Sequence, residues 1–336
     1  MALTDNKYKI LSLSLYNDFK CIAQKCTSTC CAGWKIAVSD KDYKRFCSLD
    51  DIRLQKDIKD NIEEKDGKYI FKNTSDGRCA MLDDDGLCRI QKNSDEKTLC
   101  NTCRKFPRLT SVCNDEIWMS FAASCPVTAE YLIKDDIAFI YKDTGNVSDG
   151  KKEVDDIEAV SEIMSYYKEG CRIIENVSYE DRCIIRYNKY LDIISFISEI
   201  ILQDKKCRYL NGCFDYYENK CDNVVVDIEK ADIALNSVYE RLLSNYIIYR
   251  SFSRYLEFPK ECFHERYCQV MGEIMLIKLV AISRFFTFGR VSKGSWIEII
   301  NWVYRICAHG KKTSEGIHRV FCNCVKNDNI WSILTE

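Results

Sequence analysis

The chain has 336 residues, and its 49 Lys and Arg against 51 Asp and Glu give a formal charge of -2 at pH 7. The two signs are mixed along the chain, so no basic stripe of the kind that binds nucleic acid is present. The first twenty residues lack the apolar core of a secretory signal, and charges interrupt the most apolar later stretches, so we expect a cytoplasmic protein with no membrane contact. Twenty-one cysteines in such a chain favour metal binding over a disulfide framework.

The cysteines are unevenly distributed along the chain. Eleven lie between Cys21 and Cys125, and the other ten are scattered over the remaining residues. In the first part, apolar and smaller or polar residues alternate over 34–38, and the Asp85-Gly86 pair offers a tight turn, so a few short strands are expected there.

The segment 142–156 carries two glycines and many charges and is typical of a linker or long loop. Beyond it, apolar residues keep helical spacing from Ile157 to Tyr167 and again from Val238 to Leu256. The sequence therefore predicts a mainly α protein, in which a cysteine-rich cluster domain with a few short strands (1–141) precedes a helical domain (157–336).

Two sets of cysteines have metal-ligand character. The first is Cys21-x4-Cys26-x3-Cys30-Cys31, whose four sulfurs fall within eleven residues and can converge if the backbone loops tightly. In the second set, Cys100-x2-Cys103 has metal-ligand spacing and Cys125 is followed by proline, as in many cluster-binding runs. Its members are Cys79, Cys88, Cys100, Cys103, Cys113 and Cys125.

These patterns leave several readings open. Isolated cysteines are often buried free thiols, although clustering argues against that here. Four thiolates satisfy zinc as well as an iron-sulfur cluster, so spacing does not separate the two. The three histidines all lie beyond residue 260, and a looser set near the C-terminal end fits no compact zinc motif: Cys307, His309, His318, Cys322 and Cys324.

Several common enzyme motifs are absent. The sequence contains no G-x-G-x-x-G, no G-x-x-x-x-G-K and no G-x-S-x-G, so nucleotide-binding and serine-hydrolase functions are unsupported. The C-x3-C-x2-C run of radical adenosylmethionine enzymes is also missing, because Cys31 follows Cys30 directly. No flavin or nicotinamide motif supports an electron-transfer protein.

Four segments, taken in order, resemble the flagellin lysine-N-methylase (FliB) family, within the wider CxxCxxCC-type cysteine-cluster group. They are FKCIAQKCTSTCCAGWKIAVSD, CAMLDDDGLCRIQ, CRKFPRL and SCP, and residues 245–257 resemble the family's helical second half. The matching positions are Cys21, Cys26, Cys30, Cys31, Gly33, Trp34, Asp40, Cys79, Leu82, Gly86, Leu87, Cys88, Ile90, Gln91, Cys103, Pro107, Arg108, Ser124, Cys125 and Pro126. The departures are Val127, Cys47, Cys100 and Cys113.

The resemblance implies a protein-lysine N-methyltransferase that uses S-adenosylmethionine, acts on surface lysines of flagellin and carries a four-iron (4Fe-4S) cluster. The pool of cluster ligands that it implies is Cys21, Cys26, Cys30, Cys31, Cys79, Cys88, Cys103 and Cys125. Arg108 is a candidate for binding the cofactor carboxylate, since a guanidinium pairs well with carboxylates. The alternative is a non-enzymatic protein that binds zinc or iron through the same cysteines.

Overall fold

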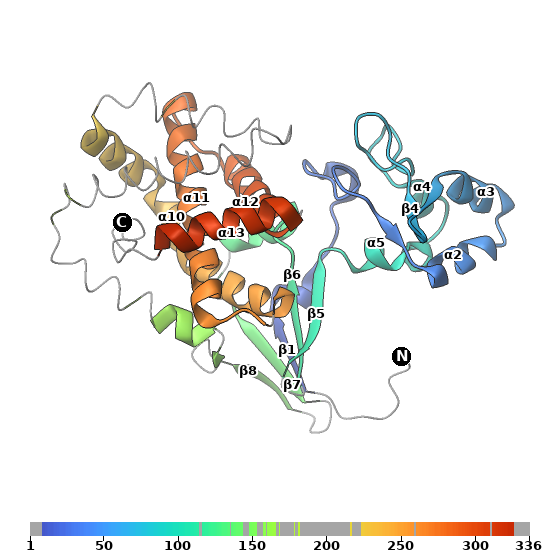
Figure 1. Cartoon of the computed structure of the whole chain (residues 1–336), viewed down its shortest axis with the longest axis horizontal. Helices are drawn as coiled ribbons and strands as arrows, with labels where there is room; N and C mark the ends of the chain where they lie inside the picture. Colours follow the sequence, from blue (N-terminus) through green and yellow to red (C-terminus); the bar gives the residue numbers. More distant parts are fainter. Residues whose placement is uncertain are drawn as a thin grey trace.

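The computed structural model describes residues 9–113, 116–134, 136–143, 148–152, 157–165 without 159, the single residues 168, 178, 181 and 216, and then 223–258, 260–309 and 311–325. A larger body of long helices and a five-stranded sheet lies beside a smaller lobe (Figure 1). No helix in these ranges is long and apolar enough to cross a membrane.

Among the described residues, the strands all precede residue 153 and the long helices all follow residue 222. The strands are β1 (Lys9–Leu13), β2 (Ala37–Val38), β3 (Ile62–Lys65), β4 (Lys68–Phe71), β5 (Arg108–Cys113), β6 (Glu116–Phe121), β7 (Phe139–Asp143) and β8 (Ser148–Lys152). The helices are α1 (Leu15–Asp18), α2 (Asp40–Cys47), α3 (Ile52–Asp60), α4 (Arg89–Asn93), α5 (Asn101–Lys105), α6 (Pro126–Lys134), α10 (Val224–Glu257), α11 (Phe263–Phe288), α12 (Lys293–Ala308) and α13 (Lys311–Val325). The predicted mainly helical fold with a few early strands is confirmed.

The five-stranded sheet has the order β5-β6-β1-β7-β8. Its central strand β1 runs parallel to β6, with Lys9 opposite Glu116, and antiparallel to β7, with Leu13 opposite Phe139. Strand β8, which forms one edge, lies inside the segment 142–156 that the sequence indicates as a linker or loop.

The smaller lobe contains the three-stranded sheet β2-β4-β3 and the short helices α2 to α5. Helix α2 begins after Ser39, whose side chain accepts from the N–H of Asp42, and α3 begins after Asp51, which accepts from two N–H groups of its first turn. Apolar faces of both helices pack on the sheet around Phe46, Ile58 and other buried residues. The lobe therefore has a hydrophobic core of its own.

In the larger body, α11 is buried along most of its length and packs against α10, α12 and α13. It ends at Gly289, whose φ of 72° lies in the left-handed region that closes helices. Gly272 lets α13 approach α11 closely, because a Cβ placed there would lie 2.1 Å from the ring of Phe321.

The hydrophobic cores do not divide at 142–156. Leu11, Phe121 and Phe139 of the five-stranded sheet share one core with Tyr246 and Phe252 of α10. The strands before the predicted linker and the helices after it therefore fold against each other.

Candidate metal centre

The candidate ligands gather where the smaller lobe joins the larger body. Residues 19–36 lead from the body into the lobe, and the chain returns between α5 and β5. The run Cys21 to Cys31 lies on the first connection, Cys103 lies on α5 beside the second, and Cys125 directly precedes α6.

One group of thiols lies beside the helical body. The thiol of Cys30 interacts electrostatically with those of Cys21 and Cys125, and Cys26 interacts with Cys21 and Cys125. The guanidinium of Arg305, on α12, interacts with Cys26, Cys30 and Cys125. These four cysteines form what we call the body group: Cys21, Cys26, Cys30 and Cys125.

A second group lies on the side of the lobe. The thiol of Cys79 interacts with those of Cys31, Cys88 and Cys100, and its backbone N–H donates to the carbonyl of Cys31 at 2.6 Å. Cys103 is hydrogen-bonded to Cys100 and also interacts with Cys31. The lobe group is thus Cys31, Cys79, Cys88, Cys100 and Cys103, and the structure brings Cys100 among the predicted ligands although the family pattern lacks it.

Two pairs of neighbouring thiols are hydrogen-bonded, and one of them, Cys30 with Cys31, links the body group to the lobe group. The Cys30 thiol donates to the Cys31 sulfur, which raises the pKa of Cys30 and lowers that of Cys31 to about 7. Likewise, the hydrogen bond from Cys103 lowers the pKa of Cys100 and raises the pKa of Cys103. Each pair therefore contains one sulfur already favoured as a thiolate, which is the form that binds metal.

Four of the other thiols favour the protonated form in the absence of metal. Burial raises the pKa of Cys26, Cys88 and Cys125, and raises that of Cys79 to about 12. Because a metal binds only the deprotonated sulfur, loading these sites releases protons.

Arg305 fixes the body group in place. Its Nη2 donates to the carbonyl oxygen of Ser28 at 3.1 Å and to that of Ser124 at 3.3 Å. Ser28 lies between Cys26 and Cys30, and Ser124 precedes Cys125. The Nε2 of His309, just after α12, lies 3.1 Å from the Ser124 hydroxyl. No local sequence pattern marks Arg305, because its partners lie 277 and 181 residues away.

The donor set fits a thiolate-bound iron-sulfur cluster. Both groups consist entirely of cysteine, and soft thiolates are the ligands of such clusters. Within the described ranges, no three or more His, Cys, Asp or Glu side chains are arranged to hold a single metal ion. The fit therefore depends on the thiol chemistry of these cysteines and on their convergence. Which of the cysteines bind a cluster stays a prediction.

Two further residues contact the segments next to these cysteines: Arg108, the candidate for binding the cofactor carboxylate, and Tyr249 of α10. The guanidinium of Arg108 lies over the rings of Phe19 and Tyr16, at 5.0 and 5.9 Å from their centroids; its binding to a cofactor carboxylate stays a prediction. Tyr249 is buried, donating to the carbonyl of Phe121 at 2.7 Å and accepting from the N–H of Ala123 at 2.9 Å, so it braces the segment that leads to Cys125.

The looser C-terminal set is only partly brought together. His309 reaches toward Ser124, whereas His318 lies 3.6 Å from the sulfur of Cys322 one turn along α13. Cys307 is fully buried on α12, and the side chain of Cys324 lies outside the described residues.

Comparison with known proteins identifies relatives of this cysteine-rich chain. Over 122 residues, 35% of this chain, it is 31% identical to the flagellar biosynthetic protein FliU of Salmonella muenchen and covers 72% of that protein. The chain belongs to the FliB and FliU family. Over the same number of residues, the chain is 30% identical to proteins named lysine-N-methylase from Salmonella typhimurium and Salmonella choleraesuis, and it covers 30% of each.

The family resemblance recognised in the sequence is thus confirmed, and the alignment spans less than a third of each lysine-N-methylase. No protein-family model matches the chain. No solved structure matches it either.

Proposed function

We propose that the chain is a protein-lysine N-methyltransferase that transfers a methyl group from S-adenosylmethionine to surface lysines of flagellin and carries a 4Fe-4S cluster. The observation that carries the proposal is its relationship to FliU and to two proteins named lysine-N-methylase. The cysteine groups at the junction of lobe and body support the cluster, because their donors are all thiols from four separate segments.

Methyl transfer to lysine places one requirement on the protein. The lysine amine must be neutral to attack the methyl carbon; as the new C–N bond forms, the bond from carbon to the sulfonium sulfur breaks, and the amine then loses a proton. Since the ordinary pKa of lysine is about 10.4, the protein must favour the neutral amine by desolvation or by accepting its proton. Thiolates of the two cysteine groups would hold the cluster, which would supply iron as a Lewis acid.

The first experiment is anaerobic purification followed by iron, sulfide and zinc analysis and by incubation with methyl-labelled S-adenosylmethionine and flagellin. We expect iron and sulfide together with label on lysine, and no label on flagellin whose amines have been acetylated beforehand. Zinc without labelling would instead indicate the non-enzymatic metal-binding protein.

A matched pair of variants tests the role of the cysteines. Cys30→Ser removes a member of the body group, so we expect loss of iron and of methyl transfer together. Cys47→Ser alters a half-buried cysteine of α2 that belongs to neither group, so iron content and labelling should stay at the wild-type level. Full activity in an iron-free Cys30→Ser protein would refute the proposed link between cluster and activity.

A further inference from the structure

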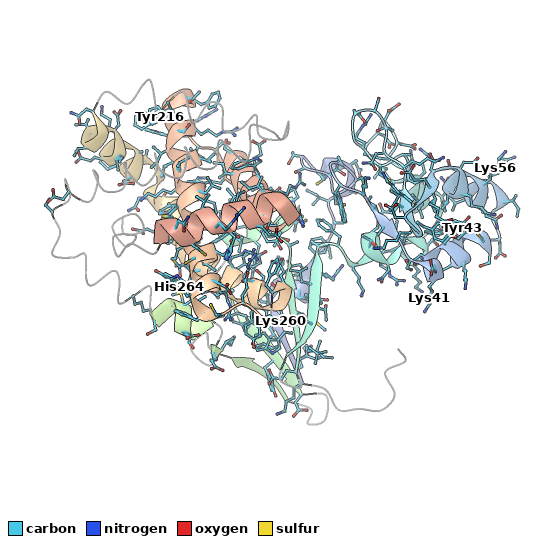
Figure 2. The ribbon with its side chains drawn as sticks, viewed as in Figure 1. Lys41, Tyr43, Lys56, Tyr216, Lys260 and His264 are labelled. Carbon is cyan, nitrogen blue, oxygen red and sulfur yellow. The ribbon has the colours of Figure 1, made fainter. Side chains whose placement is uncertain are left out.

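A chain of two thiols and two imidazoles links α11 to α13, away from the cysteine groups of the junction. On α11, the sulfur of Cys268 lies 3.5 Å from Nε2 of His264, and on α13 the sulfur of Cys322 lies 3.6 Å from Nε2 of His318. The side chains of Cys268 and Cys322 are hydrogen-bonded to each other across the two helices. His264 is exposed at the start of α11 (Figure 2), Cys322 is half-buried and Cys268 is buried.

The two sulfurs meet because the helices approach closely one turn away. Gly272, four residues after Cys268, accommodates the ring of Phe321, which is next to Cys322 in the sequence. Any side chain at position 272 would collide with that ring, so the glycine sets the spacing that brings the thiols within reach of each other.

Buried groups hold His318 in one tautomer. Glu273 is fully buried and accepts from Nε2 of Gln269 at 2.7 Å, which turns the Gln269 oxygen toward Nδ1 of His318 at 2.8 Å. Nδ1 must then carry a hydrogen, so Nε2 is the nitrogen that faces Cys322. A thiol beside an imidazole whose second nitrogen is held by an amide is the arrangement of an activated sulfur nucleophile.

We propose that Cys322 is a nucleophilic thiolate that undergoes thiol-disulfide exchange with small-molecule disulfides and that Cys268 resolves the product. The Cys322 sulfur attacks one sulfur of the disulfide, a new S–S bond forms, and the other half leaves as a thiolate. Cys268 then gives up its proton to Nε2 of His264, which lies 3.5 Å away, and attacks the Cys322 sulfur, so that the second half leaves as a thiolate. The two protein thiols are oxidised by two electrons, the small disulfide is reduced to two thiols, and a bond joins α11 to α13.

The test uses the full-length holoprotein, prepared anaerobically and exposed to glutathione disulfide, with peptide mapping by mass spectrometry. We expect a Cys268–Cys322 disulfide to form at least tenfold faster than any adduct on Cys47, a half-buried cysteine of the lobe that serves as an internal control. In Cys268→Ser the reaction should stop at a glutathione adduct on Cys322, and in Cys322→Ser no adduct should form on Cys268.

A further variant distinguishes activation of Cys322 by His318 from simple solvent exposure of the thiol. His318→Gln removes the imidazole while keeping a polar side chain, so the exchange at Cys322 should slow severalfold, whereas circular dichroism should report an unchanged helical fold. Adducts on Cys322 that form no faster than those on Cys47 would overturn the proposal. So would a zinc ion that is held by these four side chains and lost in Cys322→Ser, because the thiolate would then be a metal ligand. None of these readouts depends on methyl transfer.

Discussion

Arg305 of α12 donates a hydrogen bond to the carbonyl oxygen of Ser28, 277 residues earlier in the chain. The same guanidinium nitrogen reaches Ser124, so a single side chain of the helical body holds both backbone segments that carry the body group. These bonds join the predicted cluster region to helices that lie far away in the sequence.

Replacing Arg305 by alanine should therefore loosen both segments. We expect a loss of about 2 kcal/mol in the free energy of unfolding, typical of hydrogen bonds to charged groups, and faster loss of iron during anaerobic gel filtration. Arg305→Lys keeps the charge but not the planar fork, so it should recover only part of the loss. Urea unfolding and iron analysis measure the two effects.

Arg241→Ala provides the control for that experiment. Arg241 also donates to a backbone carbonyl, that of Lys134 at 3.2 Å, but its side chain is 53% exposed. Its removal should cost less than about 1 kcal/mol, as for other exposed charged contacts, and should leave the iron content unchanged. Equal effects of the two substitutions would contradict the special role of Arg305.

A buried ion pair stabilises the middle of the helical body. Glu273 of α11 accepts from Nε and Nη2 of Arg250 at 2.8 and 3.1 Å and from the hydroxyl of Tyr246 at 2.7 Å. Both charged side chains are fully buried. Glu273→Ala would leave Glu257 as the one carboxylate that the guanidinium contacts among the described residues, and we expect a cost of about 3–5 kcal/mol, the range for breaking a buried pair.

The double variant Arg250→Met/Glu273→Leu distinguishes the cost of an unpaired charge from the value of the pair itself. Replacing both partners by apolar side chains of similar volume is often nearly neutral, so this protein should regain most of the stability that Glu273→Ala loses. Thermal unfolding followed by circular dichroism provides the comparison. If the double variant is as unstable as the single one, the ion pair itself contributes the stability.

The sequence anticipates the composition of the candidate site better than its arrangement. The clustering of Cys21 to Cys31 and the Cys125-Pro126 pair are local patterns, and they lead to the family that the comparisons confirm. The pairing of Cys79 with Cys31 and the position of Arg305 depend on contacts between distant segments, and such contacts produce no periodic pattern in the sequence. The parallel pairing of β1 with β6 is likewise non-local, and for that reason the sequence does not reveal that the first strand shares a core with the last helices.

The segment 142–156 illustrates a second limit. Its glycines and charges are typical of a loop, yet residues 148–152 form β8 at the sheet edge. An edge strand exposes one side to solvent and tolerates charged side chains, so composition alone does not distinguish it from a linker.

The close contact of Gly272 with Phe321 predicts a size limit at position 272. Gly272→Ala places a methyl group where the aromatic ring lies, and it should destabilise the protein by about 1–3 kcal/mol, as overpacking usually does. The double variant Gly272→Ala/Phe321→Leu should recover part of that loss. Gly294→Ala is the control, because a Cβ there would meet its nearest atom at an ordinary 3.8 Å; destabilisation equal to that of Gly272→Ala would contradict the crowding.

The reactivity of Cys322 toward alkylating reagents should depend on pH differently from that of an ordinary thiol. Hydrogen bonds from Cys268 and His318, together with the nearby His264, lower the pKa of Cys322 to about 5. The hydrogen bond with Cys322 raises the pKa of His318, Glu261 raises it further, and Arg254 lowers it. Only the thiolate reacts, so the reactive form is complete above pH 6 and is lost as the pH falls through 5. We therefore expect iodoacetamide to label the Cys322 peptide at a constant rate between pH 6.5 and 8.5, measured by quantitative mass spectrometry. The labelling of a free cysteine, with a pKa near 8.5, should accelerate roughly tenfold per pH unit over most of this range.

Two variants of Cys268 provide the control. In Cys268→Ser the hydroxyl still donates to Cys322, so the pH profile of labelling should change little, whereas Cys268→Ala should move the profile to higher pH. A wild-type profile like that of free cysteine would exclude the activated thiolate.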